Sequence, residues 1–425
     1  MMLAIFFILF FVLLLLNVPI VFSMLIPSVL YIVSNPNLEL SMVAVKIMGG
    51  VDSFTLLSLP LFVFAGNIMN FGLVTERIFN FAHVITKHRR GGLGYANILA
   101  SLIFAGMSGS ACADAGSLGA IELKAMREHN YDEDFAMAVT GASSMLGPIF
   151  PPSMPMTLIA FSTGVSLGKL FAAGVLPAIL LAIVMMVKVF FDCRKKNYIV
   201  DEKAPLKEVI STFKYAFPCL MMPIAMLGGI YSGIFTPTET AAVISIYCLI
   251  LAFAYKALTA GGLLNIIAES VRAVMMMSVI CTTSQLFAYV LTLEKVPQRL
   301  VSFFSTYVTT PVVFWIAVIV LFLVLGCFLD DSVSQLIIVP LLLPIATGLG
   351  IQPLHFCIIS TILIVMGLCT PPVGMVLYML QGVSSLSYER IAKAVVPYLL
   401  ITLIGVVILI IFPQITMVLP TLLFK

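Results

Sequence analysis

The chain has 425 residues, of which 61% are hydrophobic and 10% are charged, and its formal net charge is +3. A soluble domain cannot bury so large an apolar fraction. Apolar runs recur along the chain, for instance Met2–Leu16, Pro311–Leu329 and Tyr398–Phe412, and a spanning helix needs about 20 such residues. The composition therefore predicts an all-α polytopic membrane protein and excludes a β-barrel, whose strands would alternate polar and apolar residues.

The N-terminal segment is expected to stay in the membrane, because no basic residue precedes Lys46 and a cleaved signal peptide would carry one. Residues 2–33 and then 49–72 are predicted to cross the bilayer. The eight cysteines form no CxxC pair and lie mostly in apolar runs, so buried, reduced thiols are expected. The four histidines lack the spacing of a metal site.

One hydrophilic stretch divides the chain in two, with the sequence DCRKKNYIVDEKAPLKEV beginning at Asp192. A shift of 220 residues superposes the helix-breaking residues of the two parts, although most other positions differ. The matching pairs are Gly106 with Gly326, Gly147 with Gly367, Pro151-Pro152 with Pro371-Pro372, and Pro177 with Pro397. We therefore expect one structural repeat over 1–191, a cytoplasmic connector over 192–214 and a second repeat over 215–425.

Positive charge is distributed unequally between the two repeats. Residues 80–169 contain six Lys or Arg side chains, whereas the matching window 300–389 contains none. Since positive loops remain cytoplasmic, corresponding loops should face opposite sides, which is the inverted-repeat architecture of many secondary transporters. Lys295 and Arg299 lie outside the second window and fit this pattern less well.

Each repeat is predicted to contain an amphipathic arm, a re-entrant hairpin and a broken transmembrane helix. In the first repeat these are residues 73–90, 93–127 and 132–163, followed by a crossing at 168–190. An extra crossing at 215–233 restores the inverted orientation. The second repeat then has crossings at 235–255 and 264–290, an arm at 293–308, a hairpin at 312–347, a broken helix at 353–382 and a final crossing at 388–412. The N-terminus is expected inside and the C-terminus outside.

The helix breaks are the positions at which chemistry is expected. Both GPIFPP, from Gly147, and GLCTPP, from Gly367, place two prolines after a glycine. Proline removes a backbone donor and clashes with the preceding turn, so main-chain oxygens are released at bilayer depth and must face protein, water or an ion. Carbonyl and hydroxyl oxygens suit a hard cation such as Na⁺, and helix N-termini favour an anionic substrate group.

The hairpin tips add polar side chains to the breaks. They carry Ser108, Ser110 and Asp114 in one repeat and Asp330 and Asp331 in the other. Carboxylates within a membrane are costly and are by default functional candidates. Two polar pockets related by the repeat are therefore predicted near the middle of the membrane.

Several motifs resemble the large membrane subunit of tripartite ATP-independent periplasmic (TRAP) transporters. They are GGIYSGIFTPTETAAV from Gly228, SGSACAD from Ser108 and GPIFPPSMPM from Gly147, and NVPIVF and LPLFVFAGNIM fit as well. The resemblance covers essentially the whole chain. It implies a multi-pass protein of the bacterial inner membrane that is no enzyme but a Na⁺-driven importer of an organic acid, with elevator-type transport and scaffold domains. It also implies a separate small four-helix membrane subunit and a periplasmic binding protein that delivers the substrate.

The resemblance also assigns roles to individual residues. The first Na⁺ site would use Ser108, Ser110, Gly147, Phe150 and Pro151, and the second would use Gly326, Cys327, Gly367 and Thr370. A sialic acid or a C4-dicarboxylate would lie between the tips and the breaks, with Ser108, Asp114, Ser153, Asp330 and Asp331 as candidate contacts. The second break lacks the serine of FPPSMP, so its ion site should rely more on carbonyls and Thr370.

Two alternatives remain open at this point. GMSG at Gly106 matches the GxSG pattern of an intramembrane serine protease, in which Ser108 would need a histidine base such as His355. This interpretation leaves the tip and break of the second repeat unexplained. The other alternative is a stand-alone secondary transporter without partner subunits. The chain contains no GxxxxGK[ST] loop that would bind ATP.

Overall fold

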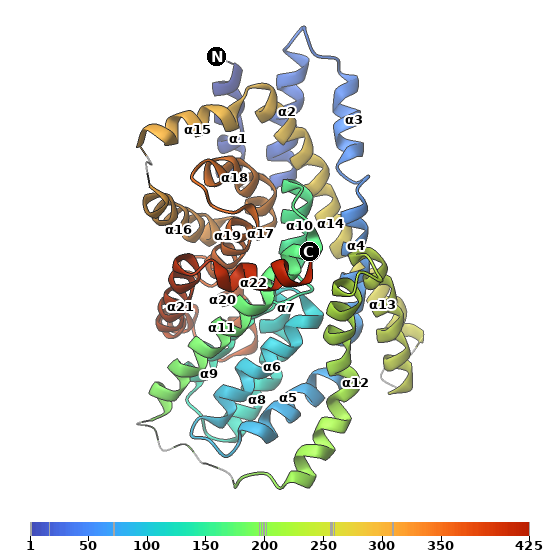
Figure 1. The fold of residues 1–425 in the computed structure, drawn as a ribbon, viewed down its shortest axis with the longest axis vertical. Helices are drawn as coiled ribbons and strands as arrows, with labels where there is room; N and C mark the ends of the chain where they lie inside the picture. Colours follow the sequence, from blue (N-terminus) through green and yellow to red (C-terminus); the bar gives the residue numbers. More distant parts are fainter. Residues whose placement is uncertain are drawn as a thin grey trace.

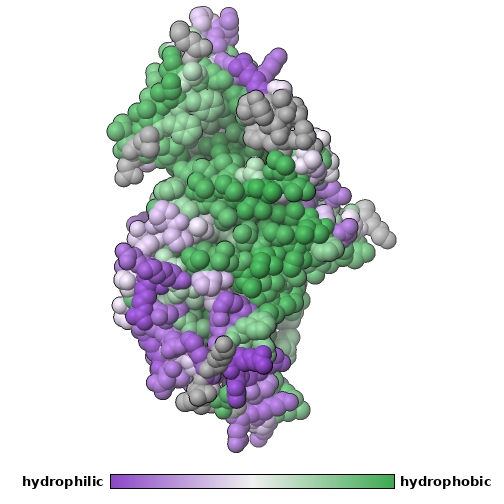
Figure 2. Space-filling view, turned by 90° about the vertical axis from the view of Figure 1, so that its left-hand side faces the viewer, coloured by the Kyte–Doolittle hydropathy of each residue, from purple (hydrophilic) through white to green (hydrophobic). Residues whose placement is uncertain are grey.

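The computed structural model describes residues 2–424 except 17, 71, 72, 195, 197, 199, 201, 256, 257, 259, 308 and 309. Regular structure within this part is entirely helical (Figure 1). Seven of the described helices are long and apolar enough to cross a membrane, or eight if one bent pair counts as a span. On the face shown in Figure 2, apolar residues cover the middle and much of the upper part, and hydrophilic residues gather mainly at the lower end. The predicted all-α membrane fold is confirmed.

The described residues of the first half form eleven α-helices and two short irregular helical segments. They are α1 (Met2–Leu15), α2 (Ile20–Val33), α3 (Ser41–Gly49), α4 (Phe54–Asn70), α5 (Leu73–Thr86), α6 (Gly92–Ser108), α7 (Ala111–Ala113), the π-helical η1 (Asp114–Leu118), α8 (Gly119–Glu128), α9 (Glu133–Ser143), the 3₁₀ turn η2 (Ser144–Leu146), α10 (Met154–Thr163) and α11 (Leu167–Cys193).

The second half follows the connector and repeats the hairpin and the broken helix. Its elements are α12 (Leu206–Tyr231), α13 (Pro237–Ala254), α14 (Ala260–Leu293), α15 (Val296–Tyr307), α16 (Pro311–Phe328), α17 (Asp331–Val333), the π-helical η3 (Ser334–Ile338), α18 (Val339–Gly348), α19 (Pro353–Gly367), α20 (Met375–Val383), α21 (Tyr388–Ile411) and α22 (Gln414–Leu423). Lys195 of the connector and residue 308 of the predicted second arm lie outside the described residues.

The repeat is clearest in the irregular parts of the backbone. The segment α17–η3–α18 has the same bounds as α7–η1–α8 shifted by 220 residues, including the π-helical turn in each. Residues 111–118 read ACADAGSL and residues 331–338 read DSVSQLII, with no identity at any position. The two hairpins therefore share a backbone path that their side chains do not reveal.

Both ends of the chain differ from the sequence prediction. Residues 2–33 form two helices packed against each other, with the rings of Phe6 and Tyr31 6.1 Å apart. Each helix has 14 residues and is about 21 Å long, shorter than the roughly 30 Å hydrocarbon core. The crossing expected at 49–72 corresponds to α4, and α3, for which no element was predicted, precedes it at an angle of 51°. Helix α22 follows the segment expected to end the fold.

The described residues form two hydrophobic cores. The larger one joins the first hairpin to α9, α11, α19 and α21, and the smaller one joins α1, α2 and α14 to Val333, Leu336 and Ile337 of the second hairpin. In Figure 1 the first hairpin rises from the lower end and the second enters from the left, with α7 and α17 near the centre. Helix α14 thus lies between the N-terminal helices and the second hairpin tip.

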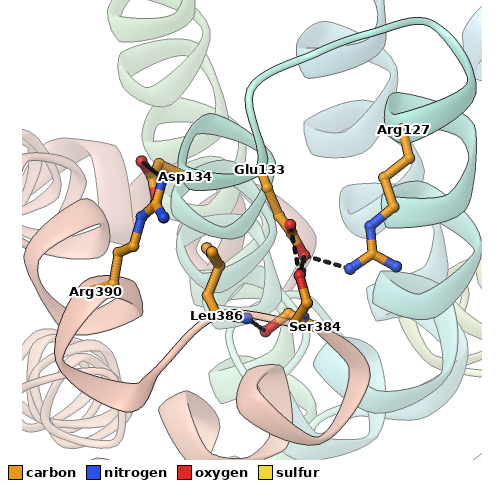
Figure 3. Close-up of polar contacts among 7 residues, drawn as sticks. Arg127, Glu133, Asp134, Ser384, Leu386 and Arg390 are labelled. Carbon is orange, nitrogen blue, oxygen red and sulfur yellow. Dashed lines mark hydrogen bonds and ion pairs between the residues drawn. The ribbon is translucent and has the colours of Figure 1, made fainter.

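A polar cluster joins the two repeats beside the start of α9 (Figure 3). The guanidinium of Arg390 donates two hydrogen bonds, of 2.6 and 2.9 Å, to the carboxylate of Asp134. Glu133 forms an ion pair with Arg127 of the first hairpin and accepts hydrogen bonds of 3.1 and 2.9 Å from the backbone N–H and the hydroxyl of Ser385. One end of the first hairpin is therefore attached to the segment between α20 and α21.

Glycines allow α16 and α19 to cross in contact. A Cβ on Gly326 would lie 2.6 Å from the Cα of Gly367, so Gly326→Ala should force the two helices apart. Overpacking of this kind costs about 1–3 kcal/mol, and a lower midpoint of thermal unfolding in detergent is the expected result. Gly348→Ala is the matched control, because nothing lies within 4 Å of its Cβ. Equal melting temperatures for the two variants would contradict the crossing.

Candidate functional site

The first hairpin tip packs directly on the first helix break. Gly109 ends α6 in the left-handed conformation, with φ of 60°, and a Cβ there would lie 2.9 Å from the carbonyl oxygen of Pro152. A Cβ on Gly147 would lie 3.3 Å from the carbonyl oxygen of Ser110. Tip and break therefore meet through backbone atoms, which only glycine permits at Gly109.

Several oxygens at this junction have no protein partner. Within the described residues, no hydrogen bond ends on the carbonyl oxygens of Gly147, Phe150 and Pro151. The hydroxyl of Ser108 is buried and also has no partner. Buried oxygens without donors are unusual in native proteins and call for a water or an ion. The predicted first-site residues thus supply unpaired oxygens, and the hydroxyl of Ser110, which caps α7 by accepting from the N–H of Ala113 at 3.5 Å, lies beside them.

Ser153 has a structural task within the first break. Its hydroxyl donates to the carbonyl of Pro148 and accepts the N–H of Met156 at 3.2 Å. It therefore caps the N-terminus of α10, where the chain resumes its helix after the prolines. The side chain is 1% exposed, so its predicted contact with a substrate would require the cap to rearrange.

The second break satisfies its own backbone more completely. The hydroxyl of Tyr388 donates to the carbonyls of Pro372 and Val373 at 2.8 and 2.7 Å. The thiol of Cys327 lies 3.3 Å from the carbonyl oxygen of Pro371. The N–H of Thr370 donates to Gly367 at 2.9 Å, and its hydroxyl donates to the carbonyl of Met366 at 2.8 Å. Gly326 and Gly367, the other predicted ligands there, pack against each other.

The predicted acidic residues occupy three different environments. Asp330 caps α17 by accepting the N–H of Ser332 at 3.0 Å. Asp331 accepts from the amide of Gln335 at 3.2 Å. Asp114 begins η1 and is 2% exposed, with no hydrogen-bond partner on either carboxylate oxygen. In the repeat, Ser110 corresponds to Asp330 as a cap, and Asp114 corresponds to Ser334.

Both tips and both breaks border one small cavity of about 60 Å³. Ser110 and Cys112 come from the first tip and Asp331 and Ser332 from the second, while Pro148 and Leu368 belong to the two breaks. Met277 of α14 completes the wall. The structure therefore brings both tips and both breaks to one shared cavity, which Asp331 alone of the five candidate substrate residues lines directly.

Sequence reasoning missed several residues of this region. Gln335 is fully buried and holds Asp331, and Ser334 has a buried hydroxyl without a partner. Both were visible as polar side chains in the apolar run that follows Asp331, and the 220-residue shift would have aligned Ser334 with Asp114. Met277 carried no signal, because it is one of many apolar residues of α14.

The close contact at Gly109 can be separated from backbone strain by two variants. Gly109 and Gly164 both have positive φ, of 60° and 73°, but only Gly109 would place a Cβ against another backbone atom. Gly109→Ala should displace the tip and raise the rate at which maleimide labels Cys112 several-fold. Gly164→Ala should leave that rate unchanged. Mass spectrometry of Cys112 provides the readout, and equal rates in both variants would contradict the packing of tip on break.

The protease alternative is excluded by the relatives of this chain, and the structure gives His355 a different partner. His355 lies in the first turn of α19, where its ring is hydrogen-bonded to the hydroxyl of Thr416 of α22 at 2.8 Å. Twelve residues separate it from Gly367, which puts it about 18 Å along the helix from the second break. Ser108 instead adjoins the first break. The relatives given below are permeases, so the hydrolase interpretation is wrong.

Comparison with known proteins agrees with this geometry. A family model described as the DctM component of the tripartite ATP-independent periplasmic transporter matches residues 7–415. The sialic acid TRAP transporter large permease SiaM of Vibrio cholerae is 38% identical over 96% of this chain and 95% of its own. The C4-dicarboxylate large permease DctM of Pseudomonas aeruginosa is 35% identical over 89% of this chain and 88% of its own.

Two further comparisons concern length and fold. The sialic acid TRAP permease SiaT of Haemophilus influenzae is 36% identical over 96% of this chain, which covers 66% of SiaT. The YdaH transporter of Alcanivorax borkumensis has a TM-score of 0.61 at 12% identity, covering 87% of this chain and 86% of that one, and shows the fold alone. The chain belongs to the tripartite ATP-independent periplasmic transporter family as its large permease component, a multi-pass protein of the inner membrane.

Proposed function

We propose that this chain carries an organic acid inward, coupled to Na⁺, through the cavity shared by its two repeats. The observation that carries the proposal is the meeting of both tips and both breaks around that cavity. A transporter with inverted repeats binds its substrate where the repeats meet.

The substrate proposed is a carboxylate, either a sialic acid or a C4-dicarboxylate. Relatives at 38% and 35% identity are named for these two classes. None of the described residues that line the cavity is Arg or Lys. A substrate carboxylate would therefore rely on the hydroxyls of Ser110 and Ser332, on backbone donors at the starts of α7 and α17, and on a bound cation.

The first junction fits a Na⁺ ion better than the second does. Ser108, Gly147, Phe150 and Pro151 offer oxygens without hydrogen-bond partners, which is the oxygen-only donor set that a hard cation prefers. A bound Na⁺ would place a positive charge next to these oxygens and next to the carboxylate of the substrate. In the second junction the carbonyl oxygen of Gly367 already accepts the N–H of Thr370, and that of Pro371 lies 3.3 Å from the thiol of Cys327, so we expect weaker binding there.

The size of the cavity implies movement. It measures about 60 Å³, room for about two water molecules, whereas ligand pockets usually reach about 300–1,000 Å³. The hairpins must therefore shift to admit an organic acid. We infer an elevator-type motion in which the hairpins and broken helices move against a scaffold of α1–α4 and α12–α14, with Met277 as a contact between them.

The transporter is proposed to work with two partners, a small four-helix membrane subunit on a separate chain and a periplasmic protein that delivers the substrate. The word tripartite in the family description supports three components. Exposed apolar side chains on α13 and α14, such as Ile246, Ile250 and Met276, offer surface for lipid or for the small subunit. A stand-alone carrier is the alternative.

Coupling is tested by uptake into proteoliposomes that contain this chain, the small subunit and the binding protein. Labelled N-acetylneuraminate and succinate represent the two substrate classes. An inward Na⁺ gradient should drive accumulation of one of them, and replacing Na⁺ with K⁺ should abolish it. Accumulation that is indifferent to the replacement would reject Na⁺ coupling, and equal uptake by this chain alone would favour the stand-alone carrier.

The first ion junction is tested without transport. Na⁺ should raise the midpoint of thermal unfolding of the purified protein relative to K⁺, because a ligand that binds only the folded state stabilises it. Ser108→Ala should reduce this increase, since it removes an unpaired hydroxyl oxygen. Ser117→Ala, whose hydroxyl already donates to the carbonyl of Ala113 at 2.6 Å, should retain it. An undiminished increase in the Ser108 variant would remove Ser108 from the ligand set.

A further inference from the structure

A second buried carboxyl group lies deeper in the first hairpin than the tip. Glu122 of α8 is fully buried, with 0% exposure. One of its carboxyl oxygens, Oε1, has no hydrogen-bond partner, and the other accepts from the hydroxyl of Thr140 at 3.5 Å. A carboxylate in such surroundings would carry a full negative charge with a single weak donor.

The polar groups next to Glu122 form a chain of hydrogen bonds that all point the same way. Ser101 donates to Ser143 at 3.1 Å, and Ser143 donates to the amide oxygen of Asn97 at 2.6 Å. The amide nitrogen of Asn97 donates to Thr140 at 2.7 Å, and Thr140 donates to Glu122. All five side chains are at most 2% exposed. Glu122 is the terminal acceptor of the chain, which connects α6, α9 and α8.

The described residues around Glu122 offer no counter-ion. The elements packed against α8 are α9, η1, α6 and α20, and the ionisable neighbour that interacts with Glu122 is Asp114, which is itself acidic. On α9, Glu133 pairs with Arg127, and Asp134 pairs with Arg390. Tyr95 of α6 lies beside Arg89, and Tyr378 of α20 lies against Tyr388. Lys124, on α8 itself, points to the exposed surface.

The packing of α8 on α9 around Glu122 suits a bound proton rather than a metal ion. Helices α8 and α9 are in contact here, because a Cβ on Gly119 would lie 2.8 Å from the Cγ2 of Thr140. Asp114 is eight residues from Glu122, about 12 Å along a helix, so the two carboxyl groups cannot both coordinate one ion. The described residues contain no group of three His, Cys, Asp or Glu side chains placed to hold a metal.

We propose that Glu122 is a proton-binding site inside the first hairpin. The carboxylate takes a proton from water, an O–H bond forms at Oε1, and the group changes from −1 to neutral without any redox partner. Burying an isolated carboxylate costs far more than burying the neutral acid, so the closed packing of α8 on α9 holds the proton. Separation of these helices admits water and releases it. Proton binding is thereby linked to the position of the hairpin.

Infrared spectroscopy of the purified protein tests this proposal directly. At neutral pH, Glu122→Gln should remove one carbonyl stretching band of a protonated carboxyl group from the wild-type spectrum. Glu128→Gln, at the exposed end of the same helix, should leave that band in place. If the wild-type minus Glu122→Gln difference shows a lost carboxylate band instead, Glu122 is ionised and the proposal is overturned.

A second variant keeps the test decisive if Glu122→Gln fails to fold. Thr140→Val retains the carboxyl group but removes its hydrogen-bond donor, so the protonated band should move to higher wavenumber. An unmoved band would contradict the assignment. If exchanging Na⁺ for K⁺ at constant pH shifts the carboxyl band, Glu122 binds a metal ion in place of the proton and the proposal is overturned. These spectra require no transport, so they stand or fall independently of the proposed Na⁺ coupling.

Discussion

Main-chain oxygens released from a helix inside a membrane have to find another partner, and this constraint governs the centre of the molecule. Lipid offers no donors, so each free carbonyl must be met by protein, water or an ion. The second break meets it largely with protein, through Tyr388, Thr370 and Cys327. The first break leaves the oxygens of Gly147, Phe150 and Pro151 open. Two repeats with the same backbone path therefore differ in what they can still bind.

The first hairpin carries two kinds of buried polar group at different depths. Its tip meets the shared cavity through Ser110, while Glu122 and its hydrogen-bond chain lie between α6, α8 and α9. The base of the same hairpin is tied to the second repeat through Glu133 and Ser385. A shift of this hairpin would thus alter the cavity, the surroundings of Glu122 and the contact between repeats together.

The sequence was most informative where residues restrict the backbone. Glycines and prolines 220 residues apart revealed both breaks, and the segments between them followed the same offset down to the π-helical turns. Tertiary packing left no comparable signal in the sequence. The apolar run of residues 2–33 looked long enough to cross once, but it forms two helices, the second starting after Pro19, that pack against each other. Nothing in the sequence set Glu122 apart, because its burial depends on the packing of α8 against α9 and α6.

The assignment of individual roles was limited for a related reason. Asp330 and Asp331 are neighbours in sequence, yet one caps a helix and the other faces the cavity. Gly326 and Gly367 were expected as ion ligands and are required in any case by the crossing of α16 and α19. Residue type predicts which groups can bind an ion. Which oxygens still have a free lone pair can be told only when every hydrogen bond in the break is known.

The open oxygens of the first break are tested most directly by cryo-electron microscopy of the protein in Na⁺ and in K⁺ at a resolution that shows ordered water. A Na⁺-dependent density is expected within coordination distance of the carbonyl oxygens of Gly147, Phe150 and Pro151. Maps that are identical in the two salts, with those carbonyls bonded to protein or water, would contradict it.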